Sequence, residues 1–276
     1  MKEKGESFTA LRAALYRAAH QLFDEIIIFR DPISIRILYP DEKTFLKQDV
    51  RWSASQGLPA ILRSFVAVRS RYAEDKLKDA IAKGVRQYVI LGAGLDTFAY
   101  RNPWSFLKVF EVDHPETQVF KLQRLQDSSI QIPSNLTFVP MDFESQDLGE
   151  VLLNFEFDPS LPSFFSWLGV TMYLSEDSIM KVLQTVVSLP GVVGIVFDYI
   201  SSKHASSPAY AFFKARLEQI GEPIRSNLDP EVFGKAMESI GWRVEEDLDS
   251  VKLNERYFGG GELIKGSGRI VYTVKA

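Results

Sequence analysis

The sequence predicts an α/β domain built around a mostly parallel β-sheet. Short, nearly continuous apolar runs recur along the chain, at residues 88–91, 109–112, 136–139, 164–168 and 192–197. Segments compatible with helices separate most of these runs, at residues 116–126, 176–188 and 209–220. Apolar strands that alternate with helices are typical of a parallel sheet covered by helices on both faces.

Two segments near the C-terminus predict further strands. Residues 242–245 alternate between apolar and polar, and residues 269–274 form a strand-like run after a glycine-rich stretch. Between the fifth strand and these two, residues 230–240 predict a helix that Gly241 ends. The expected sheet therefore has seven strands.

The N-terminal part has a helical pattern. Apolar residues spaced by three and four predict helices over residues 8–29 and 70–83, whereas residues 39–57 are polar and predict an irregular segment or a short helix. No repeat or linker divides the chain. We expect a single domain over residues 1–276, with an N-terminal helical cap at residues 1–65 and a Rossmann-like core at residues 66–276.

Composition excludes several classes of function. The 276 residues are 46% hydrophobic and 25% charged, with a net charge of −4, which lacks the basic footprint of a nucleic-acid binder. There is no cysteine, and the three histidines are widely scattered, so no metal site is expected. The apolar run at residues 26–29 is too short to span a bilayer. We expect a cytoplasmic protein with neither membrane nor nucleic acid as partner.

A glycine turn directly follows the first predicted strand. Residues 91–97 read Leu-Gly-Ala-Gly-Leu-Asp-Thr, and Gly92 and Gly94 let the backbone turn tightly and a ligand approach closely. About 20 residues further on, at the end of the second strand, Glu111 and Asp113 lie where an acid accepts hydrogen bonds from ribose hydroxyls. The pattern predicts a cofactor that contains adenosine.

The turn also discriminates between cofactors. The dinucleotide fingerprint needs a third glycine where this chain has Thr97, which counts against NAD and FAD. The Gly-Lys-Ser/Thr ending of a phosphate-binding loop is absent.

Further motifs surround the turn. They are Arg69-Ser70-Arg71-Tyr72-Ala73-Glu74-Asp75, Tyr100-Arg101, Phe110-Glu111-Val112-Asp113-His114-Pro115, Pro140-Met141-Asp142-Phe143 and Gly169-Val170-Thr171-Met172-Tyr173-Leu174, preceded by Arg17-Ala18-Ala19-His20 with Asp31-Pro32. In this combination the chain resembles the leucine carboxyl methyltransferase family, and most closely its bacterial branch of O-methyltransferases. The resemblance covers residues 9–199 well and the C-terminus loosely. It implies a Rossmann-like class I methyltransferase fold and S-adenosyl-L-methionine as cofactor.

The resemblance also implies a role for each site residue. Arg71, or Arg69 in its place, would pair with the carboxylate of the cofactor, and Gly92 and Gly94 would let its methionine portion pass. Asp113, with Glu111 as the second choice, would bind the ribose. The remaining roles fall to Asp142 for the adenine amino group, Phe143 for the adenine ring, and Tyr173 for the region of the transferred methyl group.

Two positions depart from the family pattern. Phe98 stands where the bacterial branch usually has arginine, and Leu168 stands where the eukaryotic enzymes carry an acid, which argues against their protein-phosphatase substrate. Two alternatives remain open: a protein that binds S-adenosylmethionine without transferring methyl groups, and a nicotinamide-dependent oxidoreductase.

The expected reaction is O-methylation of a small molecule, with a carboxylate acceptor slightly ahead of a hydroxyl. A carboxylate needs no base, whereas a hydroxyl would be helped by one, for which His114 and His204 are candidates. The acceptor should lie outside the carboxyl ends of the strands, beneath the N-terminal helices. Aromatic residues there either line an apolar pocket or pack the cap: Phe8, Tyr16, Phe23, Phe29, Tyr39, Phe45 and Trp52.

Overall fold

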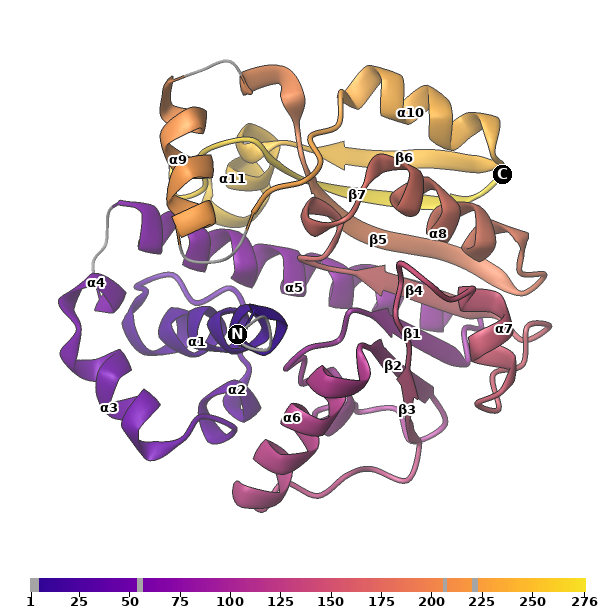
Figure 1. Cartoon of the computed structure of the whole chain (residues 1–276), viewed down its shortest axis with the longest axis horizontal. Helices are drawn as coiled ribbons and strands as arrows, with labels where there is room; N and C mark the ends of the chain where they lie inside the picture. The colour runs from indigo at the N-terminus through magenta and orange to yellow at the C-terminus, as the bar shows by residue number, and fades with distance from the viewer. Residues whose placement is uncertain (1–4, 54–56, 206–207, 220–222) are drawn as a thin grey trace.

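The centre of the structure, a computed structural model, is a seven-stranded sheet (Figure 1). The structure describes residues 5–53, 57–205, 208–219 and 223–276. The strands are β1 (Gln87–Leu91), β2 (Lys108–Asp113), β3 (Leu136–Pro140), β4 (Ser163–Trp167), β5 (Val192–Ile200), β6 (Trp242–Leu248) and β7 (Gly268–Lys275). Their order is β3-β2-β1-β4-β5-β7-β6, and β7 is the one strand that runs antiparallel to the others. This confirms the predicted seven-stranded, mostly parallel sheet.

Helices cover both faces of the sheet. The helices α7 (Leu148–Leu153), α8 (Glu176–Ser188) and α10 (Pro230–Ser239) pack on one face, and α5 (Leu58–Ala82) and α11 (Ser250–Phe258) on the other. Strand β1 shows how the sequence produces the two layers. Val89 and Leu91 belong to the first apolar cluster and Tyr88 and Ile90 to the second, because alternate side chains of a strand point to opposite faces.

Four helices form the N-terminal cap. They are α1 (Gly5–Phe23), α2 (Pro32–Arg36), α3 (Pro40–Gln48) and α4 (Val50–Ser53), and they lie beside the carboxyl ends of the parallel strands (Figure 1). Helix α1 contacts α5 and α6 (Pro115–Asp127), so the cap packs directly on the core. The remaining elements are α9 (Pro208–Gln219) and the short 3₁₀ turns η1 (Phe98–Tyr100), η2 (Thr171–Tyr173) and η3 (Ser202–His204).

The first helix ends earlier than predicted, at Phe23 instead of residue 29. His20 explains the difference. Its Nε2 accepts hydrogen bonds from the backbone amides of Ile28, at 3.1 Å, and Phe29, at 3.3 Å, while its Nδ1 lies 2.6 Å from the Asp24 carboxylate. The amides of Ile28 and Phe29 thus have hydrogen-bond acceptors without being part of a helix. The periodic apolar pattern alone therefore predicted a helix that is too long.

Helix α5 begins at Leu58, well before the predicted start at Ser70. The expected boundary between cap and core, at residues 65 and 66, therefore lies inside one continuous helix. The short helices α7 and α11 were not predicted. An aspartate begins each of them: Asp147 accepts from the amide of Glu150, and Asp249 from that of Lys252, both at 3.1 Å.

A buried ion pair joins strand β2 to helix α6. The Nζ of Lys121 lies 2.6 Å from the Glu111 carboxylate and donates to the carbonyl of Asp96 at 2.7 Å. Both charged side chains are almost completely buried. Burial raises the pKa of Glu111 to about 7, and the nearby ammonium of Lys121 opposes the increase.

We expect the substitution Lys121→Met to destabilise the fold. It leaves the Glu111 carboxylate in a dry interior without its cation, and removal of one partner of a buried pair costs about 3–5 kcal/mol. Urea unfolding at pH 8 measures the loss. The pKa of Glu111 is higher in the folded than in the unfolded protein, so the carboxyl group destabilises the fold when it is ionised and not when it is protonated. The loss in the free energy of unfolding should therefore shrink as the pH falls from 8 towards 5.

The matched control is the double variant Lys121→Met/Glu111→Gln. It removes the buried charge together with its partner, and it should regain most of the lost free energy of unfolding. A single variant as stable as the parent protein at pH 8 would show that the pair does not hold β2 and α6 together.

Candidate functional site

A cavity of about 1100 Å³ lies at the carboxyl ends of the parallel strands. Each of the first five strands contributes to its floor, with Leu91, Asp113, Met141, Leu168 and Ile200 lying at or just beyond the strand ends. Helices α1 and α5 form the opposite wall. Ligands of open parallel sheets bind at this edge, and the cavity therefore coincides with the site expected from the sequence.

The glycine turn forms one side of the cavity. Gly92 and Gly94 have positive φ angles of 64° and 49°, which favour glycine. A Cβ atom at Gly92 would lie 2.3 Å from Cγ2 of Val170, and one at Gly94 would lie 3.1 Å from Cβ of Ala10. The glycines thus allow the loop after β4 and helix α1 to close on the turn, and both line the cavity.

The two acids of strand β2 have different surroundings. Asp113 lines the cavity, and its carboxylate accepts hydrogen bonds from the backbone amides of Gly94 and, at 2.7 Å, of His114. A carboxylate offers about four acceptor positions, so it can accept further bonds from a ligand. Glu111 is not among the lining residues, because it is buried against Lys121.

The segment after β3 brings two predicted residues to the cavity. Asp142 and Phe143 both line it. The amide of Glu144 and the hydroxyl of Ser145 donate to the Asp142 carboxylate, at 2.9 and 2.8 Å, and hold its pKa below the usual value. The ring of Phe143 packs against Trp167, with the centroids 6.1 Å apart. An anionic acceptor and an aromatic face thus lie next to each other.

Of the two candidate arginines, Arg69 reaches the cavity and Arg71 does not. Arg71 is 48% exposed, and its Nε donates to the carboxylate of Asp75 at 2.9 Å, one helical turn away. The two arginines lie two positions apart on α5, and side chains at that spacing point in different directions. Arg69, and not Arg71, therefore lies at the cavity.

A buried aspartate orients Arg69. Its Nη1 donates at 3.0 Å to the carboxylate of Asp198 on β5, which also accepts from the amide of Gly169 at 2.5 Å. A Cβ atom at Gly169 would lie 2.5 Å from Nη2 of Arg69, so the missing side chain makes room for the guanidinium. Sequence reasoning missed Asp198 because the predicted fifth strand stopped at Phe197, whereas β5 continues to Ile200.

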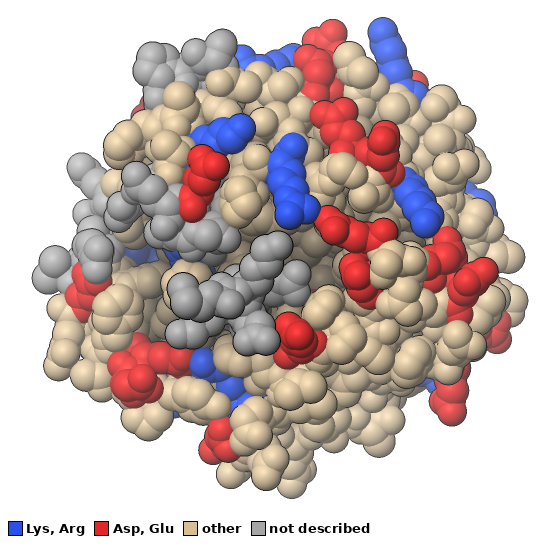
Figure 2. All heavy atoms as spheres, in the orientation of Figure 1, with Lys and Arg blue, Asp and Glu red and all other residues tan. Residues whose placement is uncertain are grey.

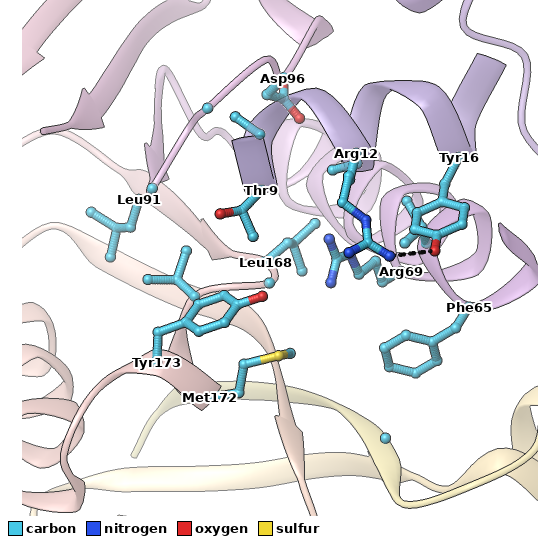
Figure 3. Close-up of a pocket in the computed structure, with 18 of the residues that line it drawn as sticks. Thr9, Arg12, Tyr16, Phe65, Arg69, Leu91, Asp96, Leu168, Met172 and Tyr173 are labelled. Carbon is cyan, nitrogen blue, oxygen red and sulfur yellow. Dashed lines mark hydrogen bonds between the residues drawn. The ribbon is translucent and has the colours of Figure 1, made fainter. Parts of the chain in front are cut away.

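Three polar side chains point into the same part of the cavity (Figure 3). Tyr173, from η2, points its hydroxyl towards the guanidinium groups of Arg12 on α1 and Arg69 on α5. Arg12 was not predicted as a site residue. Its Nη2 donates to the hydroxyl of Tyr16 at 3.2 Å.

The apolar wall of the cavity comes mainly from α5. Leu58, Ile61, Leu62 and Phe65 line it one turn after another, on the same face as Arg69. Of the seven aromatic residues expected in the cap, Tyr16 lines the cavity, while Trp52 packs against Tyr16 and Phe45. The spacing of 58, 62, 65 and 69 was the available signal, and the late predicted start of the helix hid it.

Charged side chains of both signs line the cavity. The carboxylates come from the loops after β1, β2 and β3 and from the start of α6: Asp96, Asp113, Glu116, Asp142 and Glu144. The guanidinium groups of Arg12, Arg17 and Arg69 come from α1 and α5. On the outer face seen in Figure 2, acidic and basic side chains are interspersed.

One of the two candidate histidines lies at the cavity. His114 lines the cavity beside Asp113, and its Nδ1 accepts a long hydrogen bond, 3.4 Å, from the amide of Glu116 at the start of α6. The side chain of His204 lies outside the described part of the chain.

The glycine-rich C-terminal stretch contributes at the rim. Lys265, Gly266, Ser267 and Gly268 line the cavity, and Gly259, with φ of 58°, ends helix α11. Within the described ranges, no helix combines the length and apolar character needed to cross a membrane.

Comparison with known proteins identifies the family. The model of the leucine carboxyl methyltransferase family matches residues 10–187. The chain is 32% identical to YktD of Bacillus subtilis, a candidate S-adenosyl-L-methionine-dependent methyltransferase by name, over 94% of this chain and 93% of that protein. A Mycobacterium bovis protein with the same kind of name is 38% identical over 137 residues, which are 49% of this chain and 44% of the relative.

A solved structure agrees at the level of the fold. The methyltransferase domain of bacterial CtHen1 superposes with a TM-score of 0.50 at 10% sequence identity, covering 76% of this chain and 99% of that domain. The chain belongs to the leucine carboxyl methyltransferase family of S-adenosylmethionine-dependent methyltransferases.

Proposed function

We propose that the protein transfers the methyl group of S-adenosylmethionine to an oxygen of a small molecule, with a carboxylate as the preferred acceptor and a hydroxyl as the second candidate. The charged side chains that line the cavity carry this proposal. Asp96, Asp113 and Asp142 offer carboxylates at or just beyond the strand ends, where a nucleoside would bind, and Arg12 and Arg69 offer guanidinium groups from helices α1 and α5.

The residues at the sheet edge fit the cofactor. Asp113 and Asp142 offer carboxylate oxygens to the ribose hydroxyls and the adenine amino group, and Phe143 offers its ring to the adenine. Gly92 and Gly94 bring backbone close to the ligand. Arg69 offers a guanidinium to the cofactor's carboxylate, a group whose two oxygens match the arginine fork.

Positioning is the main task of the protein in this reaction. When bound, the cofactor supplies an electrophilic methyl group on a sulfonium, which an acceptor oxygen can take in one displacement. Alignment of two reactants in a cavity can lower a barrier by up to about 7–11 kcal/mol. Tyr173, with its hydroxyl directed between Arg12 and Arg69, is placed to contact the region of transfer.

The polar side chains with which α1 and α5 line the cavity favour a carboxylate acceptor over a hydroxyl acceptor. A phenol or alcohol needs a base to take its proton, and the described lining residues of α1 and α5 include arginines but neither histidine nor carboxylate. A carboxylate is already ionised at neutral pH and needs only a cation to bind it. The arginine-lined wall thus suits an acid.

Two experiments test the residues assigned to the cofactor. The first tests whether Arg69 contacts the cofactor's carboxylate. We expect Arg69→Leu to weaken binding of S-adenosylhomocysteine by about 10- to 100-fold, the size of a lost charge-assisted hydrogen-bonded contact. Binding of methylthioadenosine, which lacks the amino acid portion, should stay nearly unchanged. Calorimetry measures both, and Arg69→Lys provides a second variant that keeps a cation beside Asp198.

The control for this experiment is Arg71→Leu. Because Arg71 is half exposed and pairs with Asp75, its loss should leave both affinities unchanged. An equal loss of affinity for the two ligands in a folded Arg69→Leu protein would contradict a contact with the cofactor's carboxylate.

The acids of β2 provide the second experiment. Asp113→Ala should weaken S-adenosylhomocysteine and methylthioadenosine alike, by about 10-fold or more, because both ligands contain the ribose. Glu111→Gln should leave both dissociation constants within about twofold, a change of less than about 0.5 kcal/mol. The opposite ranking, in variants with cooperative unfolding transitions, would move the ribose site to Glu111.

The nature of the product distinguishes the acceptors. With a radiolabelled methyl donor and a panel of aromatic and aliphatic acids, phenols and peptides ending in leucine, we expect label in a product that mild base hydrolyses to volatile methanol. Such lability is the property of a methyl ester, whereas a methyl ether is stable. For an acid acceptor, kcat/KM should not increase between pH 6 and 9, because the acceptor is already ionised.

Other results would revise the proposal. A base-stable product would identify a hydroxyl acceptor, and label only in the peptides would exclude a small molecule. Tight cofactor binding with no transfer to any acceptor of the panel would favour a protein that senses S-adenosylmethionine.

A further inference from the structure

We propose that Phe65 of helix α5 limits the size of the apolar group that the methyl acceptor carries, and that its ring closes the outer end of the acceptor's site against the backbone at Gly268. This inference rests on the proposed function, because it concerns the acceptor's part of the same cavity. It adds a size limit to the acceptor and assigns that limit to one side chain.

Helix α5 and strand β5 place Phe65 one step beyond Arg69. The guanidinium of Arg69 meets the carboxylate of Asp198 on β5. The ring of Phe65 lies against Gly268, which pairs with Ile200, two residues further along β5 than Asp198. Four residues of a helix and two residues of a strand both span about 6 Å. Phe65 therefore lies further out than Arg69 from the carboxyl end of the sheet, on the acceptor's side of the proposed cofactor contact.

The ring of Phe65 and the backbone of Gly268 are in close contact. Both residues line the cavity, and Gly268 begins strand β7. A Cβ atom at Gly268 would lie 2.8 Å from Cζ and 3.0 Å from Cε2 of Phe65. The φ angle of Gly268 is not positive, so its backbone can accommodate a larger residue, and the ring is what the added side chain would meet. The place of the ring thus depends on the absence of a side chain at residue 268.

The wall that leads to Phe65 is apolar. Leu58, Ile61 and Leu62 precede it on α5 and line the cavity, and Met172 points towards it from the 3₁₀ turn η2 (Figure 3). Ile61, Leu62 and Phe65 are only half-buried, so an apolar ligand can cover their remaining surface and gain from its burial. A pocket for one drug-sized molecule typically has about 300–1,000 Å³. The cavity of about 1100 Å³ exceeds that range, which leaves space for an apolar acceptor beside the cofactor.

The test uses the full-length protein saturated with S-adenosylhomocysteine and two acids that differ by one fused ring, 2-naphthoate and 2-anthroate. Both acids fluoresce, so fluorescence titration measures the dissociation constant of each. The parent protein should bind the smaller acid more tightly. Phe65→Ala should increase the affinity for the larger acid, relative to the smaller one, by about 10-fold or more, because the space of the lost ring admits the third ring of the ligand.

Gly268→Ala should act in the opposite direction. Its methyl group displaces the ring of Phe65 into the cavity, so the affinity for both acids should fall, and that for the larger acid should fall further. The double variant Phe65→Ala/Gly268→Ala should behave as Phe65→Ala does, because the methyl group then has no ring to displace. An effect of Gly268→Ala that persists without Phe65 would indicate a disturbed strand instead, and would reject control of the site by the ring.

Phe106→Ala is the matched control. Phe106 is 51% exposed, lies outside the cavity lining, and has the guanidinium of Arg86 4.8 Å from its ring centroid. Its loss should leave both dissociation constants unchanged. All variants should bind S-adenosylhomocysteine as the parent does.

The other outcomes overturn the assignment in distinguishable ways. An unchanged ratio of the two affinities in a folded Phe65→Ala protein rejects Phe65 as the size limit. A parent complex that binds neither acid rejects the apolar wall as the acceptor's site. Weaker binding of S-adenosylhomocysteine by Phe65→Ala would place Phe65 at the cofactor. A parent protein that does not bind S-adenosylhomocysteine would reject the proposed function itself.

Discussion

The arrangement of the site depends on one buried carboxylate, that of Asp31. It is completely buried, and it accepts from Arg17 at 2.9 Å and lies 3.2 Å from Nε of Arg101. Burial by itself would raise the pKa of Asp31, but the charges of Arg17 and Arg101 outweigh it and hold the pKa below the usual value. Asp31 also accepts from the amide of Ser34 and so begins helix α2.

The partners of Asp31 join three parts of the cavity lining: helix α1, the glycine turn and helix α5. Arg17, on α1, also donates to the carbonyl of Leu95 in the glycine turn, at 2.6 Å. Arg101 follows that turn and pairs at 2.6 Å with Glu74 on α5. The cap, the turn and the long helix are therefore fixed relative to one another through a single anion. Buried charges of this kind add little net stability, but removal of one member leaves the others unpaired. We infer that the network maintains geometry more than it adds stability.

The sequence predicted what depends on local pattern and missed what depends on the packing of helices. The strands and the glycine turn were predictable because short apolar runs and glycine act over a few residues, and Asp113 follows from its position at the end of β2. The choice between Arg69 and Arg71 was not, since it depends on which face of α5 meets the sheet. Helix α5 begins at Leu58 with Pro59 in its first turn, and the apolar spacing of residues 58, 62, 65 and 69 is helical, but the prediction began the helix only at Ser70.

The two halves of the cavity have different structural origins. In the proposal, the cofactor is bound by strand ends and by a turn whose glycines are enclosed by Val170 and Ala10, so few substitutions fit there. In the same proposal the acceptor lies against side chains of α1 and α5, where a change at position 62 or 65 alters the shape of the cavity and leaves the backbone in place. Helices therefore allow the acceptor to change while the sheet edge retains the cofactor. The same separation explains why the sequence motifs identify the methyl donor, whereas the acceptor has to be inferred from the charge and the packing of two helices.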